Sequence, residues 1–439
     1  MKQHKSNSYP VVGVGLLGLG TVGGGVAEIL ASHGALIAAQ TGVKLEVRRA
    51  LVRRARIKRC GAAAAVAVTT DPAKIIGAPD IDVVVELIGG LRPARDWILA
   101  ALAAGQPVVT ANKAVLAVHG KEIFRAAERA GRDVFFEAAV AGGIPIIRTL
   151  REGLAGDRIS QVIGILNGTT NFILDAMAKG KPYDAALADA QALGFAEADP
   201  TLDVNGRDAA DKLAILTQIA YGTVVAPARM PVEGITDLTA EVVADAHRLG
   251  YRVKLLGIAQ RVGPQGGGLD VRVHPTFVPE THVLAAVPAN QNAIAVNSDA
   301  LGWSLYQGAG AGGLPTGSAV VADLVEVARN LRAGINGRVT PPRPTAAPKV
   351  VAAAAAQSAY YVRLQVREEP GVLAAVTRIL AREKVSLATV LQLDGRGPTV
   401  PVVLTAHPAT RAAMSRAIGS IARLACVRAK PQVVAILPG

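Results

Sequence analysis

The stretch VVGVGLLGLGTVG, Val11–Gly23, decides the fold of the first part of the chain. Its apolar residues, Val11–Leu17, predict a buried strand that runs into a GxGxxG loop, and an apolar stripe beyond the loop predicts a helix. This order is the context that the dinucleotide-binding fingerprint requires, because the glycines let the backbone approach a pyrophosphate at the helix N-terminus. The loop residues that we expect to contact a cofactor are Gly18, Gly20, Thr21, Val22 and Gly23.

Strand and helix signals alternate through the following residues. Strands are predicted at Ile81–Leu87, Pro107–Thr110 and Asp133–Glu137, and helices between them at Ala94–Ala104 and Gly120–Ala130. This alternation predicts a doubly wound parallel sheet, and hence the α/β class.

Two ligand candidates follow strands of this sheet. Gly89 and Lys113 lie just after a strand, at the carboxyl edge where such sheets bind ligands. Lys113 is therefore a candidate contact for cofactor or substrate. The alternative is a solvated surface lysine, which is the common case.

The second strand, near Val43–Val52, bears on the choice of cofactor. In an NAD-binding sheet it should end with an acid that holds the ribose hydroxyls. It ends instead in Arg53-Arg54. Arginine suits a 2′-phosphate, so we predict NADP with Arg53 as a contact. A solvated basic loop would give the same pattern, and NAD then stays open.

The pattern changes beyond Gly142-Gly143. Strand-like stretches at Ile159–Leu166, Val253–Ala259 and Leu269–Val278 predict an α+β substrate domain. The segment Tyr306–Asp323 predicts a glycine loop that runs into a helix and offers backbone N–H groups to the cofactor. The alternative is a simple helix-entry turn.

The stretch ALGFAEADPTLDVNGRDAADK, Ala192–Lys212, gathers acids in a basic chain. We expect its first acids on an ordered loop, with Asn205 as N-cap of a helix that runs through about Tyr221. On that helix Asp208 and Lys212 share a face with two isoleucines, so both should point inward. An inward lysine near carboxylates is a candidate proton donor, and the acids could hold a substrate ammonium group. The alternative is an exposed i,i+4 ion pair, worth about 0.3–0.5 kcal/mol.

The C-terminal part indicates a small module. Residues Arg338–Ala356 are rich in Pro and Ala, as in a linker. Beyond them the chain predicts a β-α-β-β-α-β order typical of ferredoxin-like domains, which suggests regulation more than catalysis. The expected strands are Tyr361–Val366, Ser386–Leu393, Val400–Thr405 and Gln432–Leu437, and the expected helices are Val372–Arg382 and Ala409–Ile421.

Composition limits the alternatives. The net charge of +13 raises the question of nucleic acid, but aromatics are only 3% and the basic residues are scattered apart from Arg48–Arg59. We therefore expect no nucleic-acid partner. No apolar run is expected to cross a bilayer, and the polar start favours the cytoplasm. Cys60 and Cys426 show neither metal-ligand spacing nor a disulfide framework.

Four motifs carry a resemblance along nearly the whole chain. They are GLLGLGTVGGGV at the fingerprint, TANKA around Lys113, NGTTNFIL at Asn167–Leu174 and LGFAEADPTLDVNGRDAADK. Together they resemble homoserine dehydrogenase of the monofunctional, regulated type. The tail YYVRLQVREEPGVLAAVTRIL is similar to an ACT domain, a module that commonly binds amino acids.

The resemblance implies the NAD(P)-linked interconversion of aspartate 4-semialdehyde and homoserine, on the route to threonine, methionine and isoleucine. It implies that Lys212 donates the proton, that Lys113 lies between cofactor and substrate, and that Gly194 and Gly310 lie near the nicotinamide. The substrate contacts that it implies are Glu197, Asp208, Asp203, Gly168 and Thr169. A monovalent cation such as sodium would be held by backbone oxygens of Glu137, Val140, Gly142 and Ile144. Phe195 departs from the family, which often has tyrosine there.

The resemblance also implies an organisation. It places an NAD(P)-binding domain at 1–145, completed by part of 306–338, a catalytic domain at 146–320, a linker at 339–357 and the ACT domain at 358–439. A homodimer or homotetramer is expected, with threonine or another amino acid as effector.

Two other readings compete. Aspartate-semialdehyde dehydrogenase has a similar plan but needs a cysteine nucleophile, and neither cysteine is well placed for that role. An amino-acid sensor with an inactive dehydrogenase half is opposed by the intact Lys212, Glu197, Asp208 and fingerprint.

Overall fold

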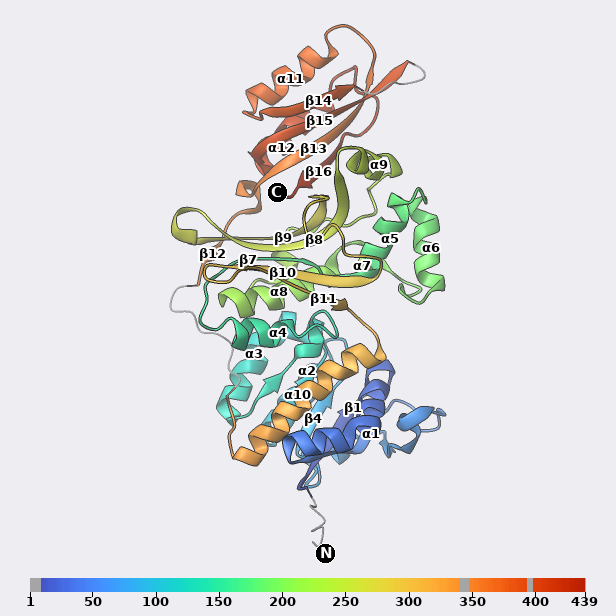
Figure 1. Ribbon diagram of the computed structural model, residues 1–439, viewed down its shortest axis with the longest axis vertical. Coiled ribbons are helices and arrows are strands. Elements are labelled where there is room, and N and C mark those ends of the chain that lie inside the picture. The colour runs from blue at the N-terminus through green and yellow to red at the C-terminus, as the bar shows by residue number, and fades with distance from the viewer. Residues whose placement is uncertain (1–8, 339–346, 393–397, 439) are drawn as a thin grey trace, which may run out of the picture. The chain divides into compact units, whose positions relative to one another are not determined.

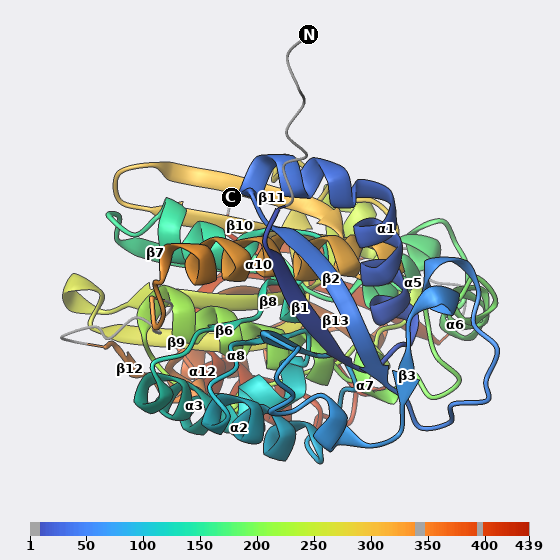
Figure 2. The same ribbon diagram turned by 90° about the horizontal axis from the view of Figure 1, so that it is seen from below.

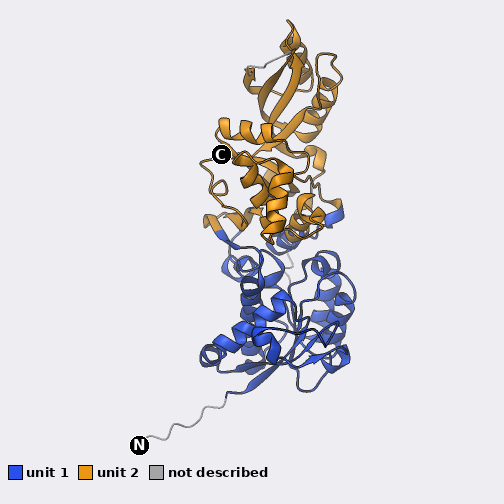
Figure 3. Ribbon diagram, turned by 90° about the vertical axis from the view of Figure 1, so that its right-hand side faces the viewer, with its two compact units in different colours: residues 1–158, 214–228, 306–347 blue, residues 159–213, 229–305, 348–439 orange. Residues whose placement is uncertain are grey.

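The structure is a computed structural model that describes residues 9–338, 347–392 and 398–438 (Figure 1). The chain forms two compact units (Figure 3). Unit 1 comprises Met1–Arg158, Ala214–Ala228 and Tyr306–Ala347, and unit 2 comprises Ile159–Leu213, Arg229–Leu305 and Pro348–Gly439. Residues 339–346 of the expected linker at 339–357 lie outside the described residues.

Unit 1 contains a parallel sheet in the order β3-β2-β1-β4-β5-β6. This is the strand order of a doubly wound dinucleotide-binding fold, so the predicted α/β class is confirmed. The strands are β1 (Val11–Leu17), β2 (Lys44–Leu51), β3 (Val68–Thr69), β4 (Val83–Glu86), β5 (Val108–Thr110) and β6 (Val134–Phe135), and the helices are α1 (Thr21–Thr41), α2 (Ala94–Ala103), α3 (Lys113–Ala130), α4 (Ile146–Arg148) and α10 (Gly313–Ala333).

Helix α10 comes from far along the chain and packs against α1 (Figure 2). The two backbones approach closely at glycines. A Cβ on Gly25 would overlap the first carbonyl of α10, and one on Gly317 would lie 2.9 Å from the carbonyl carbon of Gly25. Val320 and Leu324 of α10 are fully buried in one core with Val14 of β1. A segment about 300 residues from the fingerprint thus completes the core of unit 1.

Helix α1 corrects one expectation. By length and composition alone it is long and apolar enough to cross a membrane. The prediction was that no apolar run is long enough and free enough of turn residues to cross a bilayer, and this helix meets the criteria of length and composition alone. Val26 and Leu30 are buried in the core of unit 1, which gives the apolar composition a structural reason.

Two element boundaries also differ from the prediction. Helix α3 begins at Lys113 and not near Gly120, because the Asn112 side chain accepts a hydrogen bond from the Val115 N–H at 3.1 Å and caps the helix. Strand β6 is shorter than Asp133–Glu137, because the chain turns into a 3-10 helix at Glu137–Ala139.

Unit 2 is organised on a mixed sheet in the order β11-β10-β7-β8-β9-β16-β13-β15-β14. The predicted strands near residues 159, 253 and 269 are present as β7, β8 and β9, whereas β10 and β11 were not predicted. The strands before the C-terminal part are β7 (Ile159–Ile165), β8 (Tyr251–Val262), β9 (Gly268–Pro279), β10 (Gln291–Ser298) and β11 (Gly302–Ala309), and the helices are α5 (Gly168–Ala178), α6 (Tyr183–Ala192), α7 (Thr201–Val204), α8 (Arg207–Tyr221) and α9 (Ala240–Arg248). Helix α8 passes into unit 1 at Ala214, and β11 does so at Tyr306.

The C-terminal residues follow the β-α-β-β-α-β order that the sequence predicts. The predicted strand at Ser386–Leu393 corresponds to β14, and its last residue lies outside the described residues. The elements are β13 (Gln357–Arg367), α11 (Val372–Arg382), β14 (Leu387–Gln392), β15 (Thr399–Thr410), α12 (Arg411–Ile421) and β16 (Gln432–Ile436), and a short strand β12 (Lys349–Val350) pairs with β9.

One sheet runs through both parts of unit 2. Ala435 of β16 pairs with Thr276 of β9, and the rings of Phe277 and Tyr361 lie 4.6 Å apart. The Asp245 carboxylate on α9 accepts hydrogen bonds from the Tyr361 hydroxyl at 2.7 Å and from Arg363. The C-terminal residues, expected as a domain of their own, therefore share a sheet and buried contacts with β9 and α9.

Candidate active site

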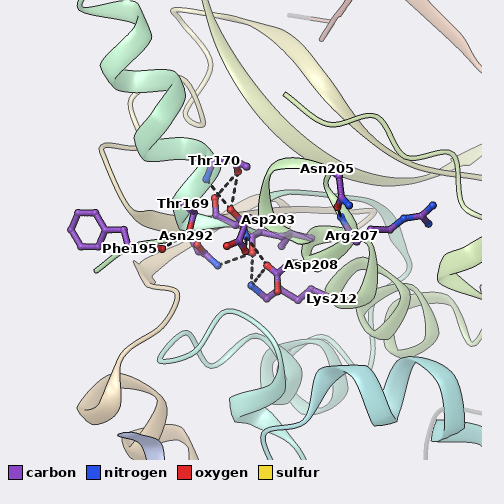
Figure 4. A network of polar contacts seen from close by, with 11 residues as sticks. Thr169, Thr170, Phe195, Asp203, Asn205, Arg207, Asp208, Lys212 and Asn292 are labelled. Atoms are coloured by element: carbon purple, nitrogen blue, oxygen red, sulfur yellow. Dashed lines mark hydrogen bonds and ion pairs between the residues drawn. The ribbon is translucent and has the colours of Figure 1, made fainter. Parts of the chain in front are cut away.

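The end of β7 and the start of α5 gather polar groups in unit 2 (Figure 4). Asn167 caps α5, because its Oδ1 accepts a hydrogen bond from the Thr170 N–H at 2.8 Å. Its Nδ2 donates to Asp203 Oδ1 at 2.7 Å and to Asp208 Oδ2 at 2.8 Å. One asparagine thus fixes the strand-to-helix turn and holds two carboxylates beside it.

Lys212 completes this cluster. Its Nζ donates to Asp208 Oδ2 at 2.8 Å and to the Leu166 carbonyl at 2.7 Å. The side chains of Lys212 and Asp208 are only 11% and 9% exposed, so this is no solvated surface pair. The helix places the lysine one turn after the acid, and the opposite charges offset part of the cost of burying each.

Helix α8 ends where the sequence predicts but begins differently. It covers Arg207–Tyr221, so the prediction of Asn205 as its N-cap is wrong: Asn205 is the C-cap of the preceding turn, and its side chain accepts a hydrogen bond from the Arg207 N–H at 3.0 Å. The residues before it were expected as a loop, but Thr201–Val204 forms the short helix α7. The Asp199 carboxylate, two residues before Thr201, accepts a hydrogen bond from the Thr201 N–H at 3.1 Å, and hydrogen bonding to Thr201 lowers the pKa of Asp199.

Asn292 on β10 is a residue that the sequence analysis missed. Its Nδ2 donates to the Leu166 carbonyl at 3.1 Å, the same oxygen that Lys212 contacts. Its Oδ1 is buried and has no hydrogen-bond partner among the described residues. The sequence signals it only as an asparagine beside the apolar run Ala293–Val296, and its contact spans 126 residues.

Glu197 lies on the loop between α6 and α7. Its side chain is exposed and makes no hydrogen bond or ion pair within the described residues. The loop that carries it is tied to α5, because the Thr169 hydroxyl donates to the Phe195 carbonyl at 2.6 Å and the Phe195 ring packs edge-on against Phe172. Gly194 begins this loop with a φ of 74°.

Gly168 is required where α5 starts. A Cβ there would overlap the carbonyl of Asn290. The first turn of α5 therefore lies against the chain that enters β10.

The fingerprint loop of unit 1 suits a pyrophosphate. Gly18 has a φ of 117°, and a Cβ on Gly23 would lie 2.5 Å from the Gly18 carbonyl oxygen, so both positions favour glycine. A Cβ on Gly20 would meet no atom of the described residues within 4 Å. Since Gly20 has no side chain to cap α1, the first N–H groups of this helix, beginning at Thr21 and Val22, are open to an anion.

Glu86 organises the neighbouring loop and was also missed. It is fully buried, and it accepts hydrogen bonds from the Ile88 N–H at 2.9 Å, the Gly89 N–H at 3.2 Å and the Thr110 hydroxyl at 2.6 Å. Burial raises its pKa. Asn112 binds the Gly90 carbonyl at 2.7 Å, directly before Lys113 opens α3. The predicted candidates Gly89 and Lys113 thus follow neighbouring strands, at the carboxyl edge of the sheet.

Arg53 follows the end of β2 and is exposed. Arg59 folds back onto its own loop and donates to the Ile57 carbonyl at 2.8 Å. The basic loop after β2 therefore exposes Arg53 to solvent. This exposure agrees with both interpretations of the loop, one in which Arg53 binds a 2′-phosphate and one in which it is only solvated.

The family resemblance implies a monovalent-cation site in the segment that begins at Glu137. This segment lies beside α10. The Glu137 carboxylate accepts the N–H groups of Ile147 at 2.8 Å and Arg148 at 2.9 Å, while its own N–H donates to Asp323 at 2.9 Å. Burial raises the pKa of Glu137, and burial and then the Glu137 charge raise that of Asp323 to about 8. The Glu137 carboxylate is thus occupied by hydrogen bonds from two backbone N–H groups.

The rest of that segment turns sharply. Gly142 has a φ of 52°, and a Cβ on it would lie 2.6 Å from the Gly310 carbonyl oxygen. The Gly143 N–H donates to the Ala309 carbonyl at 3.1 Å. Val140, Gly142 and Ile144 therefore lie on a turn that is held against the loop between β11 and α10.

Comparison with known proteins agrees with this arrangement. A family model described as the NAD-binding domain of homoserine dehydrogenase matches residues 18–137, and a model described as homoserine dehydrogenase matches residues 145–325. A nicotinamide cofactor follows from the first match.

Individual relatives match nearly the whole chain. The homoserine dehydrogenase of Neisseria gonorrhoeae is 42% identical over 424 residues, 95% of this chain and 96% of its own. A homoserine dehydrogenase structure from Thiobacillus denitrificans has 46% identity and a TM-score of 0.91, covering 97% of this chain and 98% of that one. A hyperthermophilic archaeal homoserine dehydrogenase solved with NADPH has 27% identity and a TM-score of 0.61, covering 73% and 98%. This chain is therefore an oxidoreductase acting on a CH–OH group and belongs to the homoserine dehydrogenase family.

Proposed function

We propose that the protein catalyses the reversible reduction of L-aspartate 4-semialdehyde to L-homoserine with NADPH, on the route to threonine, methionine and isoleucine. The observation that carries the proposal is the buried Lys212–Asp208 pair at the end of β7. An ammonium group kept at a site that excludes water is suited to protonate an oxygen that gains charge.

Each group has a separate task. Bound NADPH supplies the hydride that adds to the aldehyde carbon. Lys212 holds the proton on Nζ that the developing alkoxide oxygen takes up, and solvent restores it afterwards. Asp208 keeps the ammonium in place through their 2.8 Å hydrogen bond. The amine left on Lys212 after transfer also faces the Leu166 carbonyl, 2.7 Å away.

The carboxylates recognise the substrate's α-ammonium group. Asp208 and Asp203 lie on either side of Asn167, which fixes their separation. Glu197 reaches the substrate from the loop anchored by Thr169, and Gly168 and Thr169 line the opening turn of α5. Phe195 replaces a hydroxyl-bearing residue there, so recognition rests on the carboxylates.

The cofactor is held in unit 1 by the fingerprint residues Gly18, Gly20, Thr21, Val22 and Gly23. Gly89, Lys113 and Gly310 contribute from the carboxyl edge of the sheet and the β11–α10 loop, and Gly194 is a further cofactor contact that the family resemblance implies. Exposed Arg53 binds the 2′-phosphate, which favours NADP over NAD. Backbone oxygens of Glu137, Val140, Gly142 and Ile144 hold a monovalent cation such as sodium.

The C-terminal elements act as an ACT domain. Their β-α-β-β-α-β order and their sheet order β16-β13-β15-β14 support this assignment. Threonine or another amino acid is the effector, and a cytoplasmic homodimer or homotetramer is the working form.

Absorbance of NAD(P)H tests the reaction directly. Native protein should turn over aspartate semialdehyde, faster with NADPH than with NADH. Lys212→Ala should lower kcat by about 10²–10⁴-fold while NADPH still binds. Lys181→Ala is the matched control, because that lysine lies exposed on the surface beside Asp189 and should leave kcat unchanged. Native protein without turnover on either cofactor would refute the proposal and favour an amino-acid sensor.

A further inference from the structure

A second buried lysine lies in unit 2, on β8. Lys254 is only 1% exposed. Its Nζ donates to Asn171 Oδ1 at 2.8 Å, to Asp175 Oδ1 at 2.9 Å and to the Val287 carbonyl at 2.9 Å. An ammonium group has three protons, so each of them has an acceptor here. Burial lowers the pKa of Lys254, and the neighbouring Asp175 charge opposes that shift.

Helix α5 holds the turn at 287–290, which precedes β10, by two of the side chains that Lys254 contacts. Asp175 Oδ2 accepts the Ala289 N–H at 2.7 Å, and Asn171 Nδ2 donates to the Ala289 carbonyl at 2.7 Å. Ala289 has a φ of 45°, a left-handed conformation that residues other than glycine rarely adopt. Such a conformation persists where surrounding contacts determine it. Lys254 therefore joins three segments, which are β8, α5 and this turn.

A charged residue at this position supplies contacts that an apolar one cannot. Burying an ammonium group is costly, and methionine would fill a similar space at a lower cost in desolvation. Methionine, however, has no proton to donate to the Val287 carbonyl or to Asn171 Oδ1. It also has no charge to hold the Asp175 carboxylate, whose side chain is 28% exposed. The lysine thus provides direction as well as volume.

Both α5 and the turn before β10 lead to the carbonyl of Leu166. Helix α5 begins two residues after Leu166, and a Cβ on Gly168 would lie 2.3 Å from the Asn290 carbonyl oxygen. Asn292, two residues further along, donates to the Leu166 carbonyl at 3.1 Å. Lys212 Nζ donates to the same oxygen at 2.7 Å. The position of the turn therefore affects an oxygen that orients the Lys212 ammonium group.

We propose that Lys254 is a positioning residue for proton transfer by Lys212. Lys254, Asn171 and Asp175 form a clamp that holds the turn at 287–290 against α5. Asn292 then keeps the Leu166 carbonyl where the proton donor needs it. The inference rests on the proposed function, because it concerns the aim of the donor, but the clamp itself can be tested without turnover.

Hydrogen exchange of the full chain, followed by mass spectrometry, tests the clamp. Lys254→Met keeps the length of the side chain and removes its three hydrogen bonds. Peptides that cover residues 287–292 should exchange at least about tenfold faster in this variant than in native protein, because their hydrogen bonds open more often. Peptides that cover the fingerprint loop of unit 1 should exchange at the native rate.

Arg363→Met is the matched control. It removes a cation from the buried carboxylate of Asp245, in the same unit, where Tyr361 and Arg248 also contact that carboxylate. The same kind of loss is thus made at a different place. Exchange at 287–292 should stay at the native rate in this variant.

Kinetics measure the effect on the reaction. Lys254→Met should lower kcat by about 10–100-fold while the KM for NADPH changes by less than about twofold, since small displacements of reacting groups are costly. A solvent isotope effect separates misplacement from loss of folded protein. A poorly aimed donor makes proton transfer limit the rate more strongly, so the ratio of kcat in ordinary water to kcat in heavy water should rise. A smaller folded fraction lowers kcat without changing this ratio.

A double-variant cycle tests the path through Asn292. Asn292→Leu removes the donor to the Leu166 carbonyl at similar volume and should lower kcat about as much as Lys254→Met. If Lys254 acts through Asn292, the double variant should be at most about threefold slower than the slower single variant, whereas independent effects multiply.

Asp175→Asn provides a second test if Lys254→Met does not fold. The Asp175 side chain is partly exposed, so this change is milder, yet it removes the charge that faces Lys254. Exchange at 287–292 should again rise. The kcat should fall by at least about threefold, with a larger solvent isotope effect than in native protein.

Three results would overturn the proposal. Unchanged exchange at 287–292 in both clamp variants would show that Lys254 does not fix the turn. A native kcat and isotope effect in those variants would show that the turn does not aim Lys212. Losses that multiply in the double variant would exclude the path through Asn292. Native protein without turnover would instead refute the proposed function and the catalytic meaning of the clamp, while exchange would still decide whether Lys254 fixes the turn.

Discussion

Lys212 Nζ lies 2.8 Å from Asp208 Oδ2, one helical turn away, and both side chains are nearly buried. Asp208→Asn keeps the shape but removes the charge that compensates the ammonium. We expect kcat to fall by about 10²–10³-fold and the free energy of unfolding to fall by about 3 kcal/mol. Steady-state kinetics and urea unfolding measure the two effects. Asp184→Asn, at an exposed position on α6, is the control, and equal losses in both variants would refute a special role for the pair.

Asn167 makes two kinds of contact, one that caps a helix and one that holds the carboxylates of the candidate active site. Its Oδ1 caps α5 and its Nδ2 binds Asp203 and Asp208. Asn167→Asp keeps the cap but places a third carboxylate among the acids, so kcat/KM should fall by at least about 100-fold. Thr239→Ala removes a comparable cap from α9 and should cost about 1 kcal/mol of stability without affecting kcat/KM. Unchanged kcat/KM in Asn167→Asp would show that the carboxylates do not depend on this amide.

Asp323 makes the stability of unit 1 depend on pH. Burial, and then the charge of Glu137, raise its pKa from 3.8 to about 8 in the folded state. Between these values the native protein holds a proton that the unfolded chain has released. The contribution of Asp323 to stability should therefore be largest below about pH 4 and fall as pH rises toward 8.

Asp323→Asn tests this dependence, because an amide does not ionise. Thermal unfolding from pH 5 to pH 8 should show a smaller decline for the variant than for native protein. Asp184→Asn, on the surface, should follow the native curve. A native decline no larger than that of Asp323→Asn would contradict the assignment.

Two glycines of α1 should respond in opposite ways to the same change. Gly25→Ala forces a Cβ into the first carbonyl of α10 and should destabilise the protein by about 1–3 kcal/mol. Gly34→Ala meets no described atom within 4 Å and should stabilise it by about 0.5–1 kcal/mol, since alanine favours a helix. Chemical denaturation measures both, and a neutral Gly25→Ala would refute the close approach of α1 and α10.

The sequence predicts most where local residues decide the structure. The strand, glycine loop and helix from Val11 onward need only their own spacing, and the helix at Val372–Arg382 was placed at its observed bounds. The inward face of α8 followed from the spacing of Asp208 and Lys212. Their burial confirms that they point inward, while their chemical roles stay proposals.

Contacts between distant segments could not be predicted in this way. The role of α10 depends on glycines that meet α1 across nearly 290 residues, and periodicity carries no such information. Asn292 and Glu86 are polar residues whose partners lie far along the chain or in a turn, so their importance appears only in the fold. Glu197 shows the converse, because a motif named it and the structure leaves its carboxylate exposed.

The pairing of β16 with β9 has a consequence for shortened forms of this protein. A chain that stops before β13 would leave the end of β9 at Thr276 and Phe277 without its partner strand β16, with unpaired N–H and C=O groups there, and would remove Tyr361 from the Phe277 ring. Such edges recruit other strands and promote aggregation. The C-terminal elements therefore protect this end of β9 from self-association, a structural role that does not depend on the regulation proposed for them.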